Sequence, residues 1–465
     1  MNKGIRVGLA TAKTSRLIIA VILLVLAGRA FNADAQTETN LYSFKFATGA
    51  NPQAGLVQGI DGNFYGTTGL GGTGLKGIVF RISPSGSLTN LYSFSGGDGS
   101  YPFARLVQGI DGNFYGTTLN GGAGNSGTVF RISPSGSFTN LYSFSGNDGT
   151  NPYAGLVQGS DGNFYGTTSG GWTNGIGTVF RISSSGSFTN LHLFSGPDGA
   201  NPYASLVQGS DGNFYGTTVY GGTNNSGTVF RISSSGSFTN LHLFSGPDGV
   251  NPAAGLVQGS DGNFYGTTYY GGTNNSGTVF RISSSGSFTN LYSFSGNDGA
   301  NPYAGLVQGS DGNFYGTTVY GGAGGEGTVF RIGASGSLTN LHSFIRSDGS
   351  EPSAGLVQGS DGNLYGTTWI GGTGGNGTVF KLTVPLNPPA NQICEIQLLG
   401  TDIIFNIPSV AGETYQLQFT TDLTSGSWSN VDGVSVTNSI GALLTLTNFG
   451  GASQPQGFYR FDITP

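Results

Sequence analysis

The sequence predicts an all-β protein: a seven-bladed β-propeller closed by its N-terminal strand and followed by a small C-terminal β-sandwich. The motif Asp-Gly-Asn-Phe-Tyr-Gly-Thr-Thr, first seen at residues 61–68, returns every fifty residues and occurs seven times, the last with Leu364 in place of Phe. Each copy holds four short runs rich in aromatic and β-branched residues, and none of them has helical spacing. One four-stranded sheet cannot bury both of its faces, so we expect the copies to stack around an axis.

The chain begins with a segment typical of a Sec-type signal peptide. Basic residues between Lys3 and Arg16 precede an apolar run from Leu17 to Ala27, and small residues end the segment at Ala35. The apolar run is too short for a good membrane span. We therefore expect residues 1–35 to be removed and the protein to be exported to the cell surface, the medium or the periplasm. An uncleaved membrane anchor is the alternative.

The composition of the remaining chain narrows the choice of partners. Removing residues 1–35 takes away five of the 17 basic residues and one of the 23 acidic residues, so the formal net charge changes from −6 to −10. An acidic chain repels nucleic acid and anionic lipid headgroups, and we expect neither as a partner. Cys394 is the single cysteine, so the chain cannot form an intramolecular disulfide. We also expect no transmembrane segment after signal cleavage.

The unit from 255 to 294 illustrates the four predicted strands of a blade, which cover residues 255–259, 263–268, 277–283 and 288–294. Asp261-Gly262 lies between the first two runs and favours a tight hairpin. A serine- and glycine-rich turn at 284–287 connects the last two. The longer glycine-rich loop at 269–276 connects the middle pair, which makes the blade an antiparallel meander.

The two ends of the array are complementary. A fourth-strand sequence at 40–44 precedes the first full set, whereas the seventh set stops after its third strand, at Leu382. A closed ring would use residues 40–44 as the outer strand of the last blade. We therefore expect the propeller to span residues 40–383. An open solenoid or β-helix, the alternative, would not need complementary ends.

A second module follows the repeats. Prolines at 385, 388 and 389 indicate a stiff linker over residues 384–391. From 392 to 465, short runs alternate apolar and polar residues between Gly- and Asn-rich turns, which predicts a β-sandwich of six or seven strands. It is similar to the immunoglobulin-like modules found at the ends of exported bacterial proteins.

The repeat also resembles a known family. The unit Leu-Val-Gln-Gly-Ser-Asp-Gly-Asn-Phe-Tyr-Gly-Thr-Thr, followed by Gly-Gly and then Gly-Thr-Val-Phe-Arg-Ile, is similar to the GloVer tandem repeat of exported bacterial proteins. The similarity covers about residues 40–383. It implies export and a C-terminal anchoring or sorting segment, and it implies no particular biochemical activity. Asp-Gly-Asn-Phe-Tyr followed by Gly-Gly is also similar to kelch blades, at the level of fold alone.

Polar residues that recur once in every blade are expected to be structural, because a catalytic site needs a singular setting. The turn aspartates, beginning at Asp61, suit hairpins that bond their own backbone. A second aspartate, beginning at Asp98, lies in the connections between blades, in loops that lack the several carboxylates of a calcium site. The strand-three cations, beginning at Arg81, would satisfy carbonyls or pair with an aspartate. His192, His242 and His342 replace a packing tyrosine.

No catalytic residue, metal ligand or cofactor is predicted from the sequence motifs. Paired carboxylates that meet only in the folded protein are left open. Glu326 and Glu351 are the few acids that interrupt the repeat.

Comparison of the seven copies predicts one variable, aromatic face. The copies differ in the loop between strands two and three and in the connection to the next blade, and these two connections emerge on the same face of an up-and-down blade. Exposed rings among Asn, Thr and Gly suit carbohydrate, because rings stack on sugar C–H faces while amides bond the hydroxyls. The alternative is that the rings pack between blades. The candidate ligand-binding residues are Phe103, Tyr153, Trp172, Tyr203, Tyr220, Tyr269, Tyr270, Tyr303, Tyr320 and Trp369, with the densest patch expected on blades three to six.

From these observations we expect an exported, non-catalytic binding or interaction scaffold, with a polysaccharide, a cell-surface glycan or a surface protein as its partner. A polysaccharide-active hydrolase or lyase on a propeller is one alternative, and it would need a singular set of acids on the variable face. A purely structural cell-surface protein is the other.

Overall fold

The structure is a computed structural model that describes residues 7–10, 37–171, 175–383, 395–399, 402–408, 414–420, 429–437, 443–448 and 456–464. The chain divides into two compact units, one with the repeats and one with the C-terminal strands. No helix in the described ranges has the length and apolar character needed to cross a bilayer.

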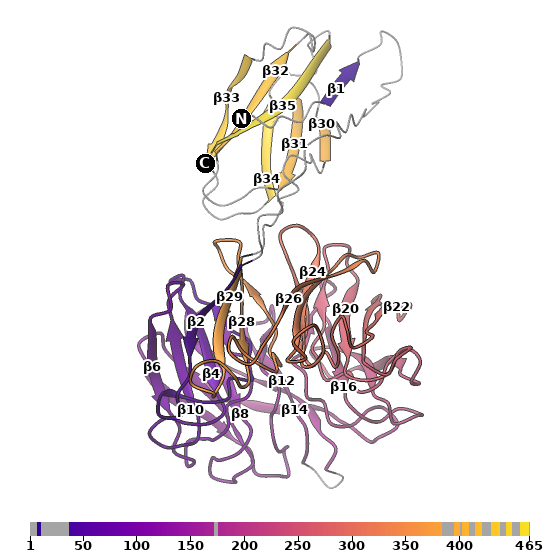
Figure 1. Cartoon of the computed structure of the whole chain (residues 1–465). Coiled ribbons are helices and arrows are strands. Elements are labelled where there is room, and N and C mark those ends of the chain that lie inside the picture. The colour runs from indigo at the N-terminus through magenta and orange to yellow at the C-terminus, as the bar shows by residue number, and fades with distance from the viewer. Residues whose placement is uncertain are drawn as a thin grey trace. The chain divides into compact units, whose positions relative to one another are not determined.

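The repeats form seven four-stranded antiparallel sheets arranged as the blades of a propeller (Figure 1). The first, innermost strands are β3 (Val57–Gln58), β7 (Val107–Gln108), β11 (Val157–Gln158), β15 (Val207–Gln208), β19 (Val257–Gln258), β23 (Val307–Gln308) and β27 (Val357–Gln358). The second strands are β4 (Phe64–Thr68), β8 (Phe114–Thr118), β12 (Phe164–Thr168), β16 (Phe214–Thr218), β20 (Phe264–Thr268), β24 (Phe314–Thr318) and β28 (Leu364–Thr368).

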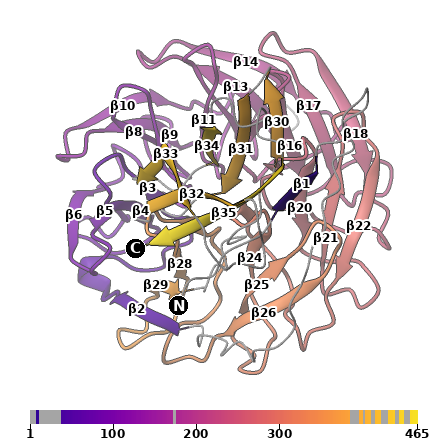
Figure 2. The same cartoon turned by 90° about the horizontal axis from the view of Figure 1, so that it is seen from above.

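The third strands are β5 (Ile78–Ile82), β9 (Thr128–Ile132), β13 (Thr178–Ile182), β17 (Thr228–Ile232), β21 (Thr278–Ile282), β25 (Thr328–Ile332) and β29 (Thr378–Thr383). The fourth strands are β6 (Leu88–Ser93), β10 (Phe138–Ser143), β14 (Phe188–Leu193), β18 (Phe238–Leu243), β22 (Phe288–Ser293), β26 (Leu338–Ser343) and β2 (Thr37–Ser43). Figure 2 shows these fourth strands at the periphery of the ring. One 3-10 turn, η1 (Phe46–Thr48), follows β2.

The predicted Asp-Gly hairpin is confirmed in the first blade. The Gly59 N–H donates to the Asn63 carbonyl at 2.8 Å, and the Gly62 N–H donates to the Gly59 carbonyl at 2.9 Å. Gly62 has a φ of +77°, which a residue without a Cβ adopts at no steric cost. The innermost strands are shorter than predicted, because the backbone before them contacts the neighbouring blade. The Thr67 hydroxyl, for example, donates to the Ala104 carbonyl across that boundary.

The ring is closed by the N-terminal strand, as predicted. β2 pairs antiparallel with β29 from Thr37 opposite Thr383 to Ser43 opposite Thr378. Side chains also cross the boundary between the seventh and first blades. Tyr365 packs on Phe64 with ring centroids 4.1 Å apart, and the Thr367 hydroxyl donates to the Ala54 carbonyl at 3.2 Å. An open solenoid is therefore excluded.

The hydrophobic core lies between blades rather than within them. Tyr65 of the first blade stacks on Phe114 of the second, with centroids 3.9 Å apart, and the same cluster includes Phe94 of the first blade and Phe130 of the second. The Tyr65 hydroxyl donates to the Asp61 carboxylate at 2.8 Å. Each blade therefore buries its faces only when both neighbours are present.

The C-terminal strands and one strand from the N-terminus, β1 (Val7–Ala10), form two sheets. One has the order β1, β35 (Gln456–Thr464), β32 (Thr414–Thr420), β33 (Ser429–Thr437), and the other has the order β30 (Glu395–Leu399), β31 (Asp402–Pro408), β34 (Leu443–Asn448). The alternating runs of the sequence do form strands, and their arrangement as an immunoglobulin-like sandwich stays a prediction. Apart from Val7–Ala10, the predicted signal peptide lies outside the described residues, as does the linker at 384–391.

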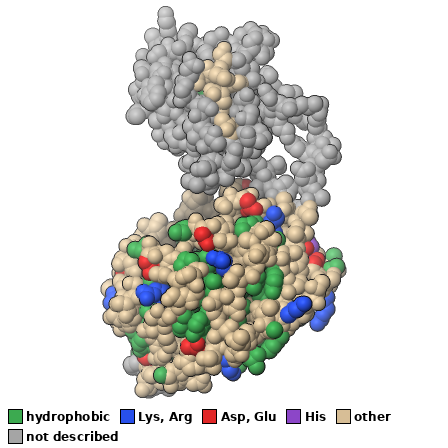
Figure 3. Space-filling model, turned by 90° about the vertical axis from the view of Figure 1, so that its left-hand side faces the viewer, with side chains coloured by type: hydrophobic (Ala, Val, Ile, Leu, Met, Phe, Trp, Pro, Cys, Tyr) green, Lys and Arg blue, Asp and Glu red, His purple; other side chains and the backbone are tan. Residues whose placement is uncertain are grey.

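Few charges mark the surface of the propeller. On the face drawn in Figure 3, isolated Lys, Arg, Asp and Glu side chains are scattered over a mostly uncharged polar surface with intervening hydrophobic patches. This agrees with a charged fraction of 9% in the sequence. Recognition on such a surface depends on uncharged polar and aromatic groups more than on long-range electrostatics.

Candidate functional site: the aromatic face

The two variable connections of each blade lie side by side. The connection leading into a blade and the loop between its second and third strands form isolated antiparallel bridges, such as Ala200 with Tyr220 and Ala300 with Tyr320. The Ala300 N–H donates to the Tyr320 carbonyl at 2.8 Å. The turns that connect the first and second strands lie at the opposite end of each blade. We call the surface formed by the bridged connections the aromatic face.

Three tyrosines are exposed at the same position of three successive blades. Tyr220, Tyr270 and Tyr320 each expose 42% of their surface. The other copies hold Leu70, Asn120, Gly170 and Ile370 at this position. A backbone bridge holds the loop at each of these positions, so the three tyrosines occupy equivalent places on blades four to six. We call them the exposed row.

A second group of rings converges on the propeller axis. Phe103 and Tyr153 have centroids 5.8 Å apart, and Tyr153 and Tyr203 have centroids 5.2 Å apart. The Tyr153 hydroxyl donates to Gln53 Oε1, two blades away, at 3.2 Å. Burial raises the pKa of Tyr303 and the neighbouring Tyr153 raises it further. Tyr153 belongs to the third blade and Tyr303 to the sixth, and blades this far apart can approach each other only near the propeller axis. These side chains therefore surround the axis at the aromatic face.

Tyr269 connects the two groups. Its ring meets Tyr270 edge to face with centroids 4.6 Å apart and meets Tyr303 in the same way at 5.8 Å. Burial, with the neighbouring Tyr320, Tyr270 and Glu351, raises the pKa of Tyr269 to about 12. A continuous aromatic path therefore runs from the exposed row to the axis.

The remaining predicted residues are less informative. Trp369 is half-buried, and its carbonyl accepts a hydrogen bond from Asn51 Nδ2 at 3.2 Å. Trp172 lies outside the described residues. The assignment of all ten aromatic residues to ligand binding stays a prediction.

The two acids that interrupt the repeat lie close together. The Glu351 N–H donates to the Glu326 carbonyl at 3.0 Å, and Glu326 accepts a hydrogen bond from the Ser350 hydroxyl. Burial raises the pKa of Glu351, and so does the Glu326 carboxylate, while Arg346 opposes both. Glu351 also contributes to the electrostatic environment of Tyr320, which places the acids at the edge of the exposed row.

The repeated polar residues have structural partners. Asp61 accepts hydrogen bonds from the Asn63 backbone and side chain and from Tyr65. Asp98 accepts from the Ser95 N–H at 2.8 Å and from the Tyr92 hydroxyl. Stacking of His192 on Phe238, with centroids 3.9 Å apart and planes 4° from parallel, matches that of Tyr92 on Phe138. The prediction that histidine replaces a packing tyrosine is therefore confirmed for this blade.

Sequence reasoning overlooked two singular side chains. Arg105 occupies an innermost position that is Gly or Ser in the other copies, and a Cβ placed on Gly55 would lie 3.6 Å from its Cδ. The Arg105 side chain is exposed, and partial desolvation by nearby protein lowers the pKa of its guanidinium. Glu38 occupies a position that is Phe or Leu in every other copy. Alignment of the copies would have revealed both residues.

Solved structures that match this chain include three bacterial proteins. The BP39L lectin from Burkholderia pseudomallei matches with a TM-score of 0.51 and 12% identity, covering 73% of this chain and 97% of the lectin. A putative 6-phosphogluconolactonase from Bacteroides fragilis matches with a TM-score of 0.43 and 14% identity, covering 90% of this chain and 99% of that protein. A second, from Bacteroides uniformis, has a TM-score of 0.39 and 16% identity, covering 71% and 98%. At 12% identity, the match to the lectin shows a similar fold alone.

Comparison with sequence families is more specific. No curated protein matches the chain. The model of the Gloeobacter/Verrucomicrobia repeat matches residues 27–210, 106–259 and 205–388, which together cover most of the chain. This agrees with the resemblance drawn from the fifty-residue unit. The chain belongs to the Gloeobacter/Verrucomicrobia repeat family.

Proposed function

We propose that this protein is a non-catalytic binding scaffold whose aromatic face binds carbohydrate. The observation that carries the proposal is the row of Tyr220, Tyr270 and Tyr320, each 42% exposed on three successive blades. Flat rings that stand on a rigid scaffold lose little conformational entropy on binding and stack on the C–H faces of sugars. Their repetition fits a ligand that is itself a repeating chain. The fold is shared with a protein described as a lectin.

A binding experiment tests this function. The chain would be applied to a polysaccharide array together with the triple variant Tyr220→Ala, Tyr270→Ala, Tyr320→Ala. We expect binding by the parent chain and at least a tenfold loss in the variant, because each stacking contact contributes to one extended site. Circular dichroism would verify that the variant remains folded.

A matched control comes from the opposite end of the blades. Ile60 and Ile110 are each 90% exposed in the turns between the first and second strands. The variant Ile60→Ala, Ile110→Ala removes exposed apolar surface of a similar kind and should bind as the parent chain does. If it lost as much binding as the tyrosine variant, the loss would not be specific to the aromatic face. If the parent chain bound no polysaccharide, the proposal would fail and the structural alternative would gain support.

One observation, on Glu351, supports the alternative that the protein is a polysaccharide-active enzyme. A carboxyl group whose pKa is raised by burial and by a second carboxylate is the usual form of a general acid in sugar hydrolysis. The test is the release of reducing ends, or of unsaturated products, from any polysaccharide that the array identifies, with Glu351→Gln as the control. Turnover by the parent chain that disappears in this variant would show that the protein is an enzyme and would overturn the scaffold proposal.

Export is part of the same proposal. The basic, apolar and small-residue order of residues 1–35 supports secretion through the Sec pathway. N-terminal sequencing of the protein recovered outside the cytoplasm should begin at Gln36. Recovery of the intact N-terminus from the membrane fraction would instead support the uncleaved anchor.

A further inference from the structure

The peripheral strands of neighbouring blades follow a packing rule. An aromatic side chain near the end of one fourth strand stacks on a phenylalanine near the start of the next. His192 stacks on Phe238 and His242 on Phe288, both with centroids 3.9 Å apart and planes 4° from parallel. The position that receives the ring is held by Phe138, Phe188, Phe238 and Phe288, or by Leu88 and Leu338. Consecutive fourth strands therefore contact each other through stacked rings and apolar side chains.

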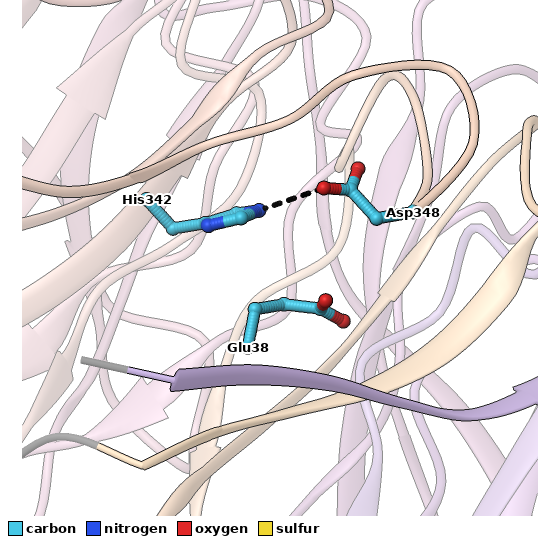
Figure 4. Close-up of side chains that lie close together, drawn as sticks. All are labelled: Glu38, His342 and Asp348. Carbon is cyan, nitrogen blue, oxygen red and sulfur yellow. Dashed lines mark ion pairs between the residues drawn. The ribbon is translucent and has the colours of Figure 1, made fainter. Parts of the chain in front are cut away.

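This rule is broken where the ring closes. β2 contributes the fourth strand of the last blade, and Glu38 lies opposite Leu382, in the register that Phe138 has opposite Ile132. The neighbour of Glu38 on the sixth blade is His342. Figure 4 shows the Glu38 side chain, which rises from β2, beside His342 from β26 and Asp348 from the connection that follows β26. We call these three residues the closing cluster.

The cluster brings three potential ligand atoms together. His342 Nε2 lies 3.3 Å from Asp348 Oδ2, and one ligand atom from each residue falls within 4.8 Å of the other two. Ligand atoms on a tetrahedral zinc ion lie roughly 3.3–3.5 Å apart, given bonds of about 2.0–2.2 Å. The His–Asp pair already has this separation, and only a small movement of Glu38 would complete a three-ligand set.

Two atoms of the cluster are buried without a hydrogen bond. They are Glu38 Oε1 and His342 Nε2. The equivalent histidines differ, because His192 Nε2 is 2.9 Å and His242 Nε2 is 2.8 Å from the corresponding aspartate with hydrogen-bonding geometry. Buried polar atoms normally have hydrogen-bond partners, so Glu38 Oε1 and His342 Nε2, which make none, are available to ligate a cation.

We propose that Glu38, His342 and Asp348 form a binding site for a divalent transition-metal ion that fastens the closing strand to the sixth blade. An imidazole nitrogen favours a borderline ion such as Zn²⁺ over Ca²⁺ or Mg²⁺, which prefer sets of oxygen ligands. Three protein ligands leave coordination positions for water. Because Glu38 and the other two residues come from opposite ends of the array, the bound ion would stabilise the closed ring.

The test uses the untagged chain after dialysis against EDTA and then against metal-free buffer. Zn²⁺ titrated by calorimetry should bind with a stoichiometry of one, and saturating Zn²⁺ should raise the midpoint of thermal unfolding. Co²⁺ should give visible absorption bands of a low-symmetry site. Ca²⁺ should produce neither the heat nor the shift in midpoint.

Two variants use residues that other copies already hold at these positions and should therefore fold. Glu38→Phe restores the receiving ring of blades two to five, and His342→Tyr restores the tyrosine found at 92, 142 and 292. Each should weaken Zn²⁺ binding at least tenfold and abolish the increase in midpoint. The matched control, His192→Tyr, alters a His–Asp pair that has Phe238 in place of a glutamate, and it should leave Zn²⁺ binding unchanged.

Three results would overturn the proposal. They are a parent chain that neither binds nor is stabilised by Zn²⁺, a Glu38→Phe variant that binds as tightly as the parent, and a loss of binding in the His192→Tyr control equal to that in His342→Tyr.

Discussion

The turn aspartates connect the hairpins of the propeller to its core. Burial by itself would raise the pKa of Asp111, but hydrogen bonds from Asn113 and Tyr115 outweigh it and hold the pKa below 3.8. The same balance lowers the pKa of Asp161 and Asp211. Since a phenol buried between blades needs a partner for its hydroxyl, the aspartate serves the packing of its blade as well as its turn.

These shifts predict a dependence of stability on acid. A carboxyl group whose pKa is lower in the folded than in the unfolded protein stabilises the fold above its unfolded pKa, and this contribution is lost as the pH falls through the folded pKa. The thermal midpoint should therefore fall as the pH decreases below about 4. In the variant Asp111→Asn, Asp161→Asn, Asp211→Asn the decrease should be smaller. Equal slopes in circular-dichroism melts of the two proteins would contradict this.

Glu38 predicts a second effect, measured without metal. In the presence of EDTA at neutral pH, Glu38→Phe should raise the free energy of unfolding by about 1–3 kcal/mol, because it removes a buried carboxyl oxygen that has no partner and provides a ring for His342 to stack on. Urea denaturation would measure the change. The control is Glu38→Leu, which copies Leu88 and Leu338 and should give a smaller gain. A destabilised Glu38→Phe variant would mean that the carboxylate stabilises the apo fold.

At the scale of elements, stacking between second strands provides a test of ring closure. Tyr215 stacks on Phe264 within the array, with centroids 3.9 Å apart, and Tyr365 packs on Phe64 across the closure at 4.1 Å. In a closed ring, Tyr215→Ala and Tyr365→Ala should each cost about 3–5 kcal/mol, because each leaves a cavity between two blades. If Tyr365→Ala cost much less, as at the free end of an open array, the closure would be weaker than the other boundaries.

The closing strand itself predicts a larger effect. Deleting residues 37–44 would leave the edge of β29 unpaired over the register from Thr383 to Thr378. We expect lower thermal stability and association between molecules, because an exposed strand edge is a template for pairing. Size-exclusion chromatography and thermal melts would detect both changes. A monomeric protein with the midpoint of the parent chain would show that β2 is dispensable.

At the scale of the whole molecule, the repeats form one compact unit of residues 36–359 and 364–383. We predict that a fragment of residues 36–383 folds on its own and unfolds at the same temperature as the corresponding transition in the full chain, since all seven blade boundaries lie within it. Differential scanning calorimetry would compare the two. A fragment that melts much earlier would mean that the C-terminal part stabilises the propeller.

Much of this architecture was predictable from the sequence. The number of copies at a fixed period gives the number of blades. Each blade has to bury the same residues against its neighbours, so the residues at the positions of Tyr65 and Phe114 repeat along the sequence. The complementary ends at residues 40–44 and 377–382 predicted closure for the same reason. The aromatic face also followed from topology, because two alternate connections of a meander must leave the same end of the blade.

The sequence by itself therefore determined the period of the repeat and the strands, turns and core positions that repeat with it. These features depend only on contacts within a blade and between neighbouring blades, which are the same in all seven copies. Tertiary structure alone decided which singular residues meet. Tyr153 reaches Gln53 and Tyr303 because the inner positions of different blades converge on one axis. Glu38 faces His342 because closing the ring places the first strand beside the sixth blade. Neither proximity is encoded in spacing along the chain, because both arise from the circular arrangement of the blades.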